Sequence, residues 1–215
     1  MEIFHTINIV THVTAGLLSL MLGFGALLVV KGGAKHLLFG KYFIRLVAVV
    51  ILTGLVGVFV YQRNTFLLVI TLLSGYTCFS GVRAIRLRGQ MPKLLDYVAP
   101  FLVSSSAIYY LYYIQSIGMY WAPTVTYSTM SALFMVTLYD LSKIFMTQSF
   151  LLKAYLYEHV YKMVSSFIAL ASAFSGTVFP QYQPYSQLLP SVFGLIYIIA
   201  TFIRLSYRPL TLKQN

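Results

Sequence analysis

Side chains that can bind a metal ion or move a proton are scarce in this sequence, which has four histidines and four acidic residues among 215. Most of them lie within or beside long apolar runs. An ionisable group at the centre of a membrane helix costs about 2.5–3.5 kcal/mol on insertion scales, so each such residue is a candidate for function. The candidates are His5, His12, His36, His159, Asp96, Asp140, Glu158 and Lys162.

One set of four is expected at the same end of these runs, and it comprises His36, His159, Asp140 and Glu158. Two imidazoles with one or two carboxylates can hold zinc or non-haem iron, with water completing the coordination. The competing interpretation is electrostatic, because Lys143 follows Asp140 by three residues and Lys162 follows Glu158 by four, and helical residues at these spacings form ion pairs. Neither HxxxH nor HExxH occurs in the chain, so both interpretations stay open.

His12 is expected to belong to a different site, because it lies deeper in its apolar run. Lys31 follows about 19 residues later, which is roughly 28 Å of helix. Gly16 comes one turn after His12, a spacing by which multi-helix b-type cytochromes seat a haem on the imidazole. A second imidazole at that depth is not evident. Near the other end of the runs, His36 and His159 could form a haem-ligating pair, with Met163 as an alternative ligand.

The elements that would position these residues are membrane helices. The chain is 59% hydrophobic and only 9% charged, with a mean hydropathy of +0.81, which is too apolar for a soluble domain. A helical crossing needs about 20 apolar residues, and the continuous runs do not alternate as barrel strands do. We therefore predict an all-α polytopic protein, a single seven-helix transmembrane domain over residues 1–215. The predicted spans are 6–30, 43–61, 65–83, 97–117, 121–142, 156–178 and 188–205.

Basic residues predict the orientation of these helices, because cytoplasmic loops of membrane proteins carry an excess of Lys and Arg. They follow the first, third, fifth and seventh runs, whereas the other connections carry only Arg63. This places the N-terminus outside and the C-terminus in the cytoplasm of a multi-pass inner-membrane protein. The net charge of +11 is spread over these loops, so nucleic acid is not an expected partner. The runs 43–61 and 65–83 are mainly aliphatic and are predicted to be scaffold.

Three short motifs carry a family resemblance: HVTAG from His12, KGGAKHLLFGKYF from Lys31, and EHVYKM from Glu158. In combination they resemble a family of bacterial multi-pass inner-membrane proteins of unknown function. That family has histidines in the first helix, the first cytoplasmic corner and a late helix, which implies functional roles for His12, His36 and His159 here. The corner departs from the pattern at Leu37, where a basic residue is usual.

Three functions are compatible with these features. The first is a protein that binds haem b or a divalent metal, zinc or iron, and serves electron transfer or the assembly of a redox complex. The second is a metal-dependent membrane hydrolase that acts on lipid, with Asp140 or Glu158 activating water. The third is a non-catalytic subunit of a membrane complex, or a carrier of lipid or quinone. The bilayer and other membrane subunits are the expected partners. Proton-coupled transport is disfavoured, because the carboxylates lie at helix ends.

Overall fold

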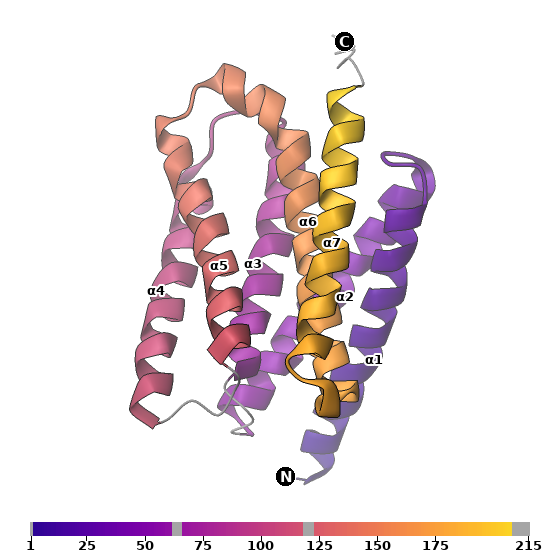
Figure 1. The fold of residues 1–215 in the computed structure, drawn as a ribbon, viewed down its shortest axis with the longest axis vertical. Coiled ribbons are helices and arrows are strands. Elements are labelled where there is room, and N and C mark those ends of the chain that lie inside the picture. The colour runs from indigo at the N-terminus through magenta and orange to yellow at the C-terminus, as the bar shows by residue number, and fades with distance from the viewer. Residues whose placement is uncertain (1, 62–65, 118–122, 208–215) are drawn as a thin grey trace.

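The computed structural model is a bundle of long α-helices that run up and down along one common direction (Figure 1). It describes residues 2–61, 66–117 and 123–207. This part of the chain contains no strand, which confirms the all-α prediction. Its helices are α1 (Glu2–Leu28), α2 (Ala34–Phe59), α3 (Phe66–Leu87), α4 (Leu94–Ile117), α5 (Pro123–Ser142), α6 (Gln148–Val178) and α7 (Tyr185–Ser206), with short 3-10 turns at Lys143–Phe145 and Pro180–Tyr182.

Each predicted apolar run corresponds to one of these helices, but several helices begin earlier than the runs do. α2 begins at Ala34 rather than 43, and α6 begins at Gln148 rather than 156. Lysine, arginine and glutamine favour helix as strongly as most apolar residues, so a helix continues into a polar segment where the apolar pattern has ended. The Thr147 side chain accepts a hydrogen bond from the backbone N–H of Phe150 and caps the start of α6.

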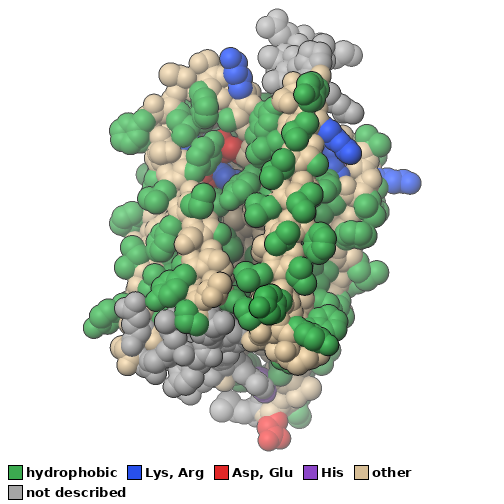
Figure 2. Space-filling model, in the orientation of Figure 1, with side chains coloured by type: hydrophobic (Ala, Val, Ile, Leu, Met, Phe, Trp, Pro, Cys, Tyr) green, Lys and Arg blue, Asp and Glu red, His purple; other side chains and the backbone are tan. Residues whose placement is uncertain are grey.

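The protein is a membrane protein, because five of its helices are long and apolar enough to cross a bilayer. These five segments are Glu2–Leu28, Ala34–Phe59, Leu68–Leu87, Leu94–Ile114 and Tyr185–Ser206. α5 and α6 are more polar, and they bury much of that polarity inside the bundle, where Asp140, Glu158 and Lys162 are buried. Figure 2 shows hydrophobic side chains over the full height of one face, with Lys and Arg side chains confined to its upper half. We call this upper end, where α3 ends and α4 and α6 begin, the basic end.

α3 and α6 form the central pair of the bundle. Half of the apolar segment of α3 is buried, whereas only 6% of the apolar segment of α7 is buried. One hydrophobic core joins α3 and α6 to α4 and α5, around Leu133 and Ala107. A second core joins the same two helices to α1 and α2, around Phe43 and Val47. Side chains on opposite faces of α6 therefore enter two different environments.

Close contact between α3 and α6 depends on small residues, which let membrane helices approach closely. The hydroxyl of Ser166 donates to the Ser74 carbonyl at 2.9 Å and lies 3.2 Å from the Ser74 hydroxyl. Nearer the basic end, a Cβ on Gly81 would lie only 3.0–3.1 Å from atoms of Met163 and Lys162. The glycine thus lets α6 bring the segment from Glu158 to Met163 against the α3 backbone.

Candidate functional site

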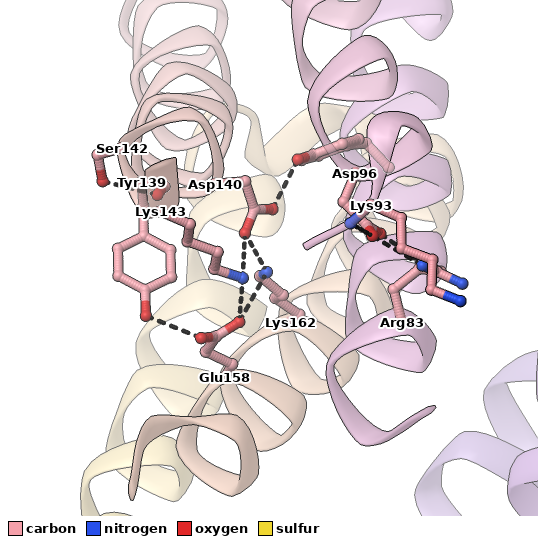
Figure 3. Close-up of polar contacts among 10 residues, drawn as sticks. Arg83, Lys93, Asp96, Tyr139, Asp140, Ser142, Lys143, Glu158 and Lys162 are labelled. Carbon is pink, nitrogen blue, oxygen red and sulfur yellow. Dashed lines mark hydrogen bonds and ion pairs between the residues drawn. The ribbon is translucent and has the colours of Figure 1, made fainter. Parts of the chain in front are cut away.

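Four charged side chains from α5, the following 3-10 turn and α6 form a closed cluster near the basic end (Figure 3). Asp140 Oδ1 accepts from Lys143 at 2.7 Å and from Lys162 at 2.6 Å. Glu158 Oε2 also accepts from both lysines, with Lys162 at 3.3 Å. Each carboxylate thus binds both ammonium groups, and the four charges sum to zero. We call these four residues the charge cluster.

Two tyrosines satisfy the remaining carboxylate oxygens of the charge cluster. Tyr76 on α3 donates to Asp140 Oδ2 at 2.6 Å, and Tyr139 on α5 donates to Glu158 Oε1 at 2.9 Å. The Tyr139 ring also lies 5.2 Å from Lys143 Nζ, within the range of a cation–π interaction. Since buried charges are tolerated only when they are paired and hydrogen-bonded, this saturation explains how four charges can sit inside an apolar bundle.

The charge cluster is closed off from solvent, and its electrostatics are set by its own members. Lys162 is only 1% exposed. Lys143 lies in the 3-10 turn beyond the end of α5. Burial alone would lower the pKa of Lys143, but the adjacent carboxylates of Asp140 and Glu158 outweigh it and hold that pKa above its ordinary value. The lysine therefore stays protonated and keeps both carboxylates engaged.

A second ion pair lies beside the charge cluster and joins α3 to α4. Arg83 donates from Nε to Asp96 Oδ1 at 2.6 Å and from Nη2 to Asp96 Oδ2 at 2.7 Å, a bidentate pair. The backbone N–H of Lys93 donates to Asp96 Oδ2 at 2.8 Å and anchors the start of α4. Together with Tyr76, this pair shows that α3, which was predicted to be scaffold, contributes polar groups that hold neighbouring helices.

His36 on α2 and His159 on α6 each hold one ring nitrogen against a backbone carbonyl. His36, in the first turn of α2, has its Nδ1 3.1 Å from the Ala26 carbonyl oxygen. His159 Nδ1 lies 2.9 Å from the Gly81 carbonyl oxygen. A carbonyl can only accept, so Nδ1 is the protonated nitrogen on both rings and Nε2 carries the lone pair. The two imidazoles are close enough to interact electrostatically. We call them the histidine pair.

His12 makes its contact far from the histidine pair, on α2. Its Nδ1 lies 2.9 Å from the Thr53 hydroxyl oxygen. That hydroxyl is directed at the Val49 carbonyl oxygen at 2.7 Å. Since the threonine proton is thereby used, His12 donates from Nδ1 and its Nε2 carries the lone pair. Gly16 lies four residues after His12, and a Cβ on Gly16 would meet no atom within 4 Å.

The predicted site residues thus divide among three places: the charge cluster, the histidine pair and the contact of His12 with Thr53. Asp140 and Glu158 bind lysines and tyrosines, which confirms the predicted Asp140–Lys143 and Glu158–Lys162 pairs. Within the described ranges, histidine, cysteine and acidic side chains nowhere gather in a group of three or more that could hold a metal ion. Met163 lies beside Gly81, one turn after His159.

Sequence reasoning missed the tyrosines and the pairs that cross between helices. A tyrosine in an apolar run is common at membrane interfaces, so Tyr76 gave no distinct signal. Tyr139 gave a clearer signal than Tyr76, because it is adjacent to Asp140 in a run that is otherwise poor in acidic residues. The Arg83–Asp96 pair spans the turn between α3 and α4. The spacing of the two residues in the sequence does not determine the geometry of that turn.

The fold and these sites define a helical membrane protein with a saturated charge cluster and a histidine pair, to both of which α6 contributes. No protein-family model, curated protein or solved structure matches the chain.

Proposed function

We propose that this protein binds a metal centre through Nε2 of His36 and His159 and serves electron transfer or the assembly of a redox complex. The observation that carries the proposal is the pair of hydrogen bonds from Nδ1 to backbone carbonyls, of Ala26 and Gly81 respectively. Metal-ligating histidines characteristically donate their second ring N–H in this way, which fixes the tautomer and turns the lone pair toward the metal. Two such rings from different helices supply two preoriented nitrogen ligands.

Either haem b or a single zinc or iron ion is compatible with these ligands. Gly40, the kind of small residue that a haem seated on the imidazole would require, follows His36 by one helical turn, and a Cβ there would meet no atom within 4 Å. Met163, one turn after His159, offers a further soft ligand. The hydrolase alternative has less support, because Asp140 and Glu158 are each bonded to two lysines and a tyrosine rather than free to activate water.

We further propose that all seven helices cross the inner membrane, with the N-terminus outside and the C-terminus in the cytoplasm. The support is the distribution of basic residues around the basic end together with the alternating direction of the helices (Figure 1). α5 and α6 would cross as well, their polar groups being satisfied inside the bundle. In this orientation the histidine pair and the charge cluster both lie toward the cytoplasm.

The test is an optical spectrum of the detergent-purified protein, oxidised and then reduced with dithionite, with metal analysis of the same sample. We expect either a Soret band that shifts on reduction or near-stoichiometric bound metal, lost in His36→Ala and in His159→Ala. His12→Ala is the matched control, because His12 lies on α1 and its imidazole contacts Thr53 rather than the histidine pair, and it should retain the signal. Wild-type protein that holds neither haem nor metal would overturn the proposal.

An open apolar groove of about 420 Å³ between the end of α6 and the start of α7 favours a second function, the binding of a lipid or quinone. Its walls are mainly aromatic and aliphatic, including Phe179, Tyr182, Leu189 and Phe193. A volume of this size accommodates a small ligand or part of a larger one. Mass spectrometry of molecules extracted from the purified protein tests this function. A bound quinone or a defined lipid lost in Leu189→Trp would support it, and an extract that matches the bulk membrane lipids would not.

A further inference from the structure

A small cavity separates the charge cluster from the Arg83–Asp96 ion pair. Its volume is about 20 Å³, which is room for one water molecule. Polar side chains from both ion-pair systems line it, among them Tyr76, Ser80, Arg83, Asp96, Asp140 and Lys162. A cavity of this size that several polar side chains face is the kind that holds an ordered water, whereas dry cavities are lined by apolar groups alone.

Unsatisfied hydrogen-bonding capacity converges on this cavity. Ser80 is 6% exposed, and its buried hydroxyl has no hydrogen-bond partner in the structure. The ammonium group of Lys162 has three hydrogens, and its bonds to Asp140 and Glu158 account for two of them. A buried hydroxyl left without a partner costs about 1–3 kcal/mol. A water molecule would satisfy Ser80 and the third hydrogen of Lys162 together.

We propose that this cavity binds one water molecule, which accepts a hydrogen bond from Lys162, pairs with the Ser80 hydroxyl and links the charge cluster to Asp96. The charges of the lining favour water over a cation, because Arg83, Lys143 and Lys162 outnumber the carboxylates that face the cavity. This site does not depend on the metal centre proposed above, since none of its residues belongs to the histidine pair.

The water connects the buried ammonium group of Lys162 to the Arg83–Asp96 pair, which is closer to solvent. The side chain of Lys162 is 2% exposed, whereas that of Arg83 is 20% exposed and that of Asp96 is 10% exposed. A hydrogen-bonded path from Lys162 through the water to the Arg83–Asp96 pair therefore reaches the surface at the basic end. Along this path the ammonium hydrogens of Lys162 exchange with bulk water although the lysine itself is buried.

Solid-state NMR of the full-length protein in lipid bilayers tests this inference. The lysines are labelled with ¹⁵N, magnetisation is transferred from water to the ammonium nitrogens, and the Lys162 signal is assigned by its disappearance in Lys162→Arg. We expect transfer to Lys162 in the wild type and its loss in Ser80→Val, whose side chain fills the cavity and lacks the hydroxyl. Ser104→Val is the matched control, because Ser104 bonds Thr137 between α4 and α5, and it should leave the transfer unchanged.

Two results would overturn the inference: no transfer to Lys162 in the wild type, or equal transfer in Ser80→Val. A density map at a resolution that shows other buried waters provides a second measurement that needs no variant. A peak within hydrogen-bonding distance of both Ser80 Oγ and Lys162 Nζ is expected. A map that shows buried waters elsewhere and none in this cavity would contradict the inference, even if Ser80→Val failed to fold.

Discussion

The charge cluster and the histidine pair use adjacent residues of α6 in opposite ways. Glu158 and His159 are neighbours in the chain, as are Lys162 and Met163, yet each neighbour enters a different side of the bundle. In the charge cluster the carboxylates bind lysines and tyrosines from the chain itself. In the histidine pair one nitrogen of each ring binds a backbone carbonyl, and the other nitrogen carries a lone pair. A charged group whose hydrogen bonds are all made within the protein stabilises the fold, whereas a nitrogen with an oriented lone pair can bind a ligand.

This contrast makes opposite predictions for substitutions on the same helix. Removing one member of a buried ion-pair network leaves a charge without compensation and costs about 3–5 kcal/mol. Removing an imidazole leaves no buried charge, so the main loss is one hydrogen bond, worth roughly 0.5–1.5 kcal/mol. The charge cluster should therefore govern stability, and the histidine pair should govern what is bound.

The largest effect is expected for Lys162→Met, which should lower the free energy of unfolding by about 3–5 kcal/mol because Asp140 and Glu158 then repel each other inside the bundle. Denaturant unfolding in a mixed micelle measures the change. Lys153→Met is the matched control, since Lys153 is an exposed lysine on the same helix, and it should change stability by less than about 0.5 kcal/mol. Equal losses in the two variants would show that the charge cluster does not contribute as described.

A double variant sharpens the same point. In Asp140→Asn with Lys162→Met, one carboxylate and one ammonium are removed together, and the Lys143–Glu158 pair remains neutral. The double variant should lose less stability than the sum of the two single losses, with a coupling of roughly 0.5–3 kcal/mol for residues in one network. The measurement is the full double-mutant cycle by denaturant unfolding. Strict additivity would mean that the two side chains act independently.

A smaller loss is expected for Tyr76→Phe, which removes the hydrogen bond to Asp140 and keeps the ring. Hydrogen bonds to charged groups contribute about 1.5–3 kcal/mol, so the variant should unfold at measurably lower denaturant concentration. Tyr112→Phe is the control, because Tyr112 is exposed on α4 and its hydroxyl should not affect stability. A wild-type midpoint for Tyr76→Phe would show that the 2.6 Å contact with Asp140 is energetically neutral.

The sequence was sufficient for contacts between residues close together in the chain and insufficient for contacts between distant helices. The spacings of Asp140 to Lys143 and of Glu158 to Lys162 place these charges together on any helix, and both pairs are present. The crossed pair of Lys162 with Asp140 depends on how α5 and α6 pack, which spacing does not specify. His36 and His159 donate to backbone carbonyls. Every residue has a backbone carbonyl, so the sequence does not indicate which one accepts the hydrogen bond. The apolar runs predicted each helix but not its polar start.

The smallest effect on folding is expected for His159→Leu, and it separates the two sites most cleanly. The loss of one hydrogen bond to Gly81 should cost roughly 0.5–1.5 kcal/mol, well below the loss in Lys162→Met. A ligand that binds only the folded state stabilises it by RT ln(1 + [L]/Kd), so adding the metal or haem identified in the wild type should raise the melting temperature of the depleted wild-type protein. The same addition should raise it in His12→Leu but not in His159→Leu. If His159→Leu were stabilised as much as the wild type, the ligand would bind without the histidine pair, and the division between a structural and a ligand-binding side of α6 would fail.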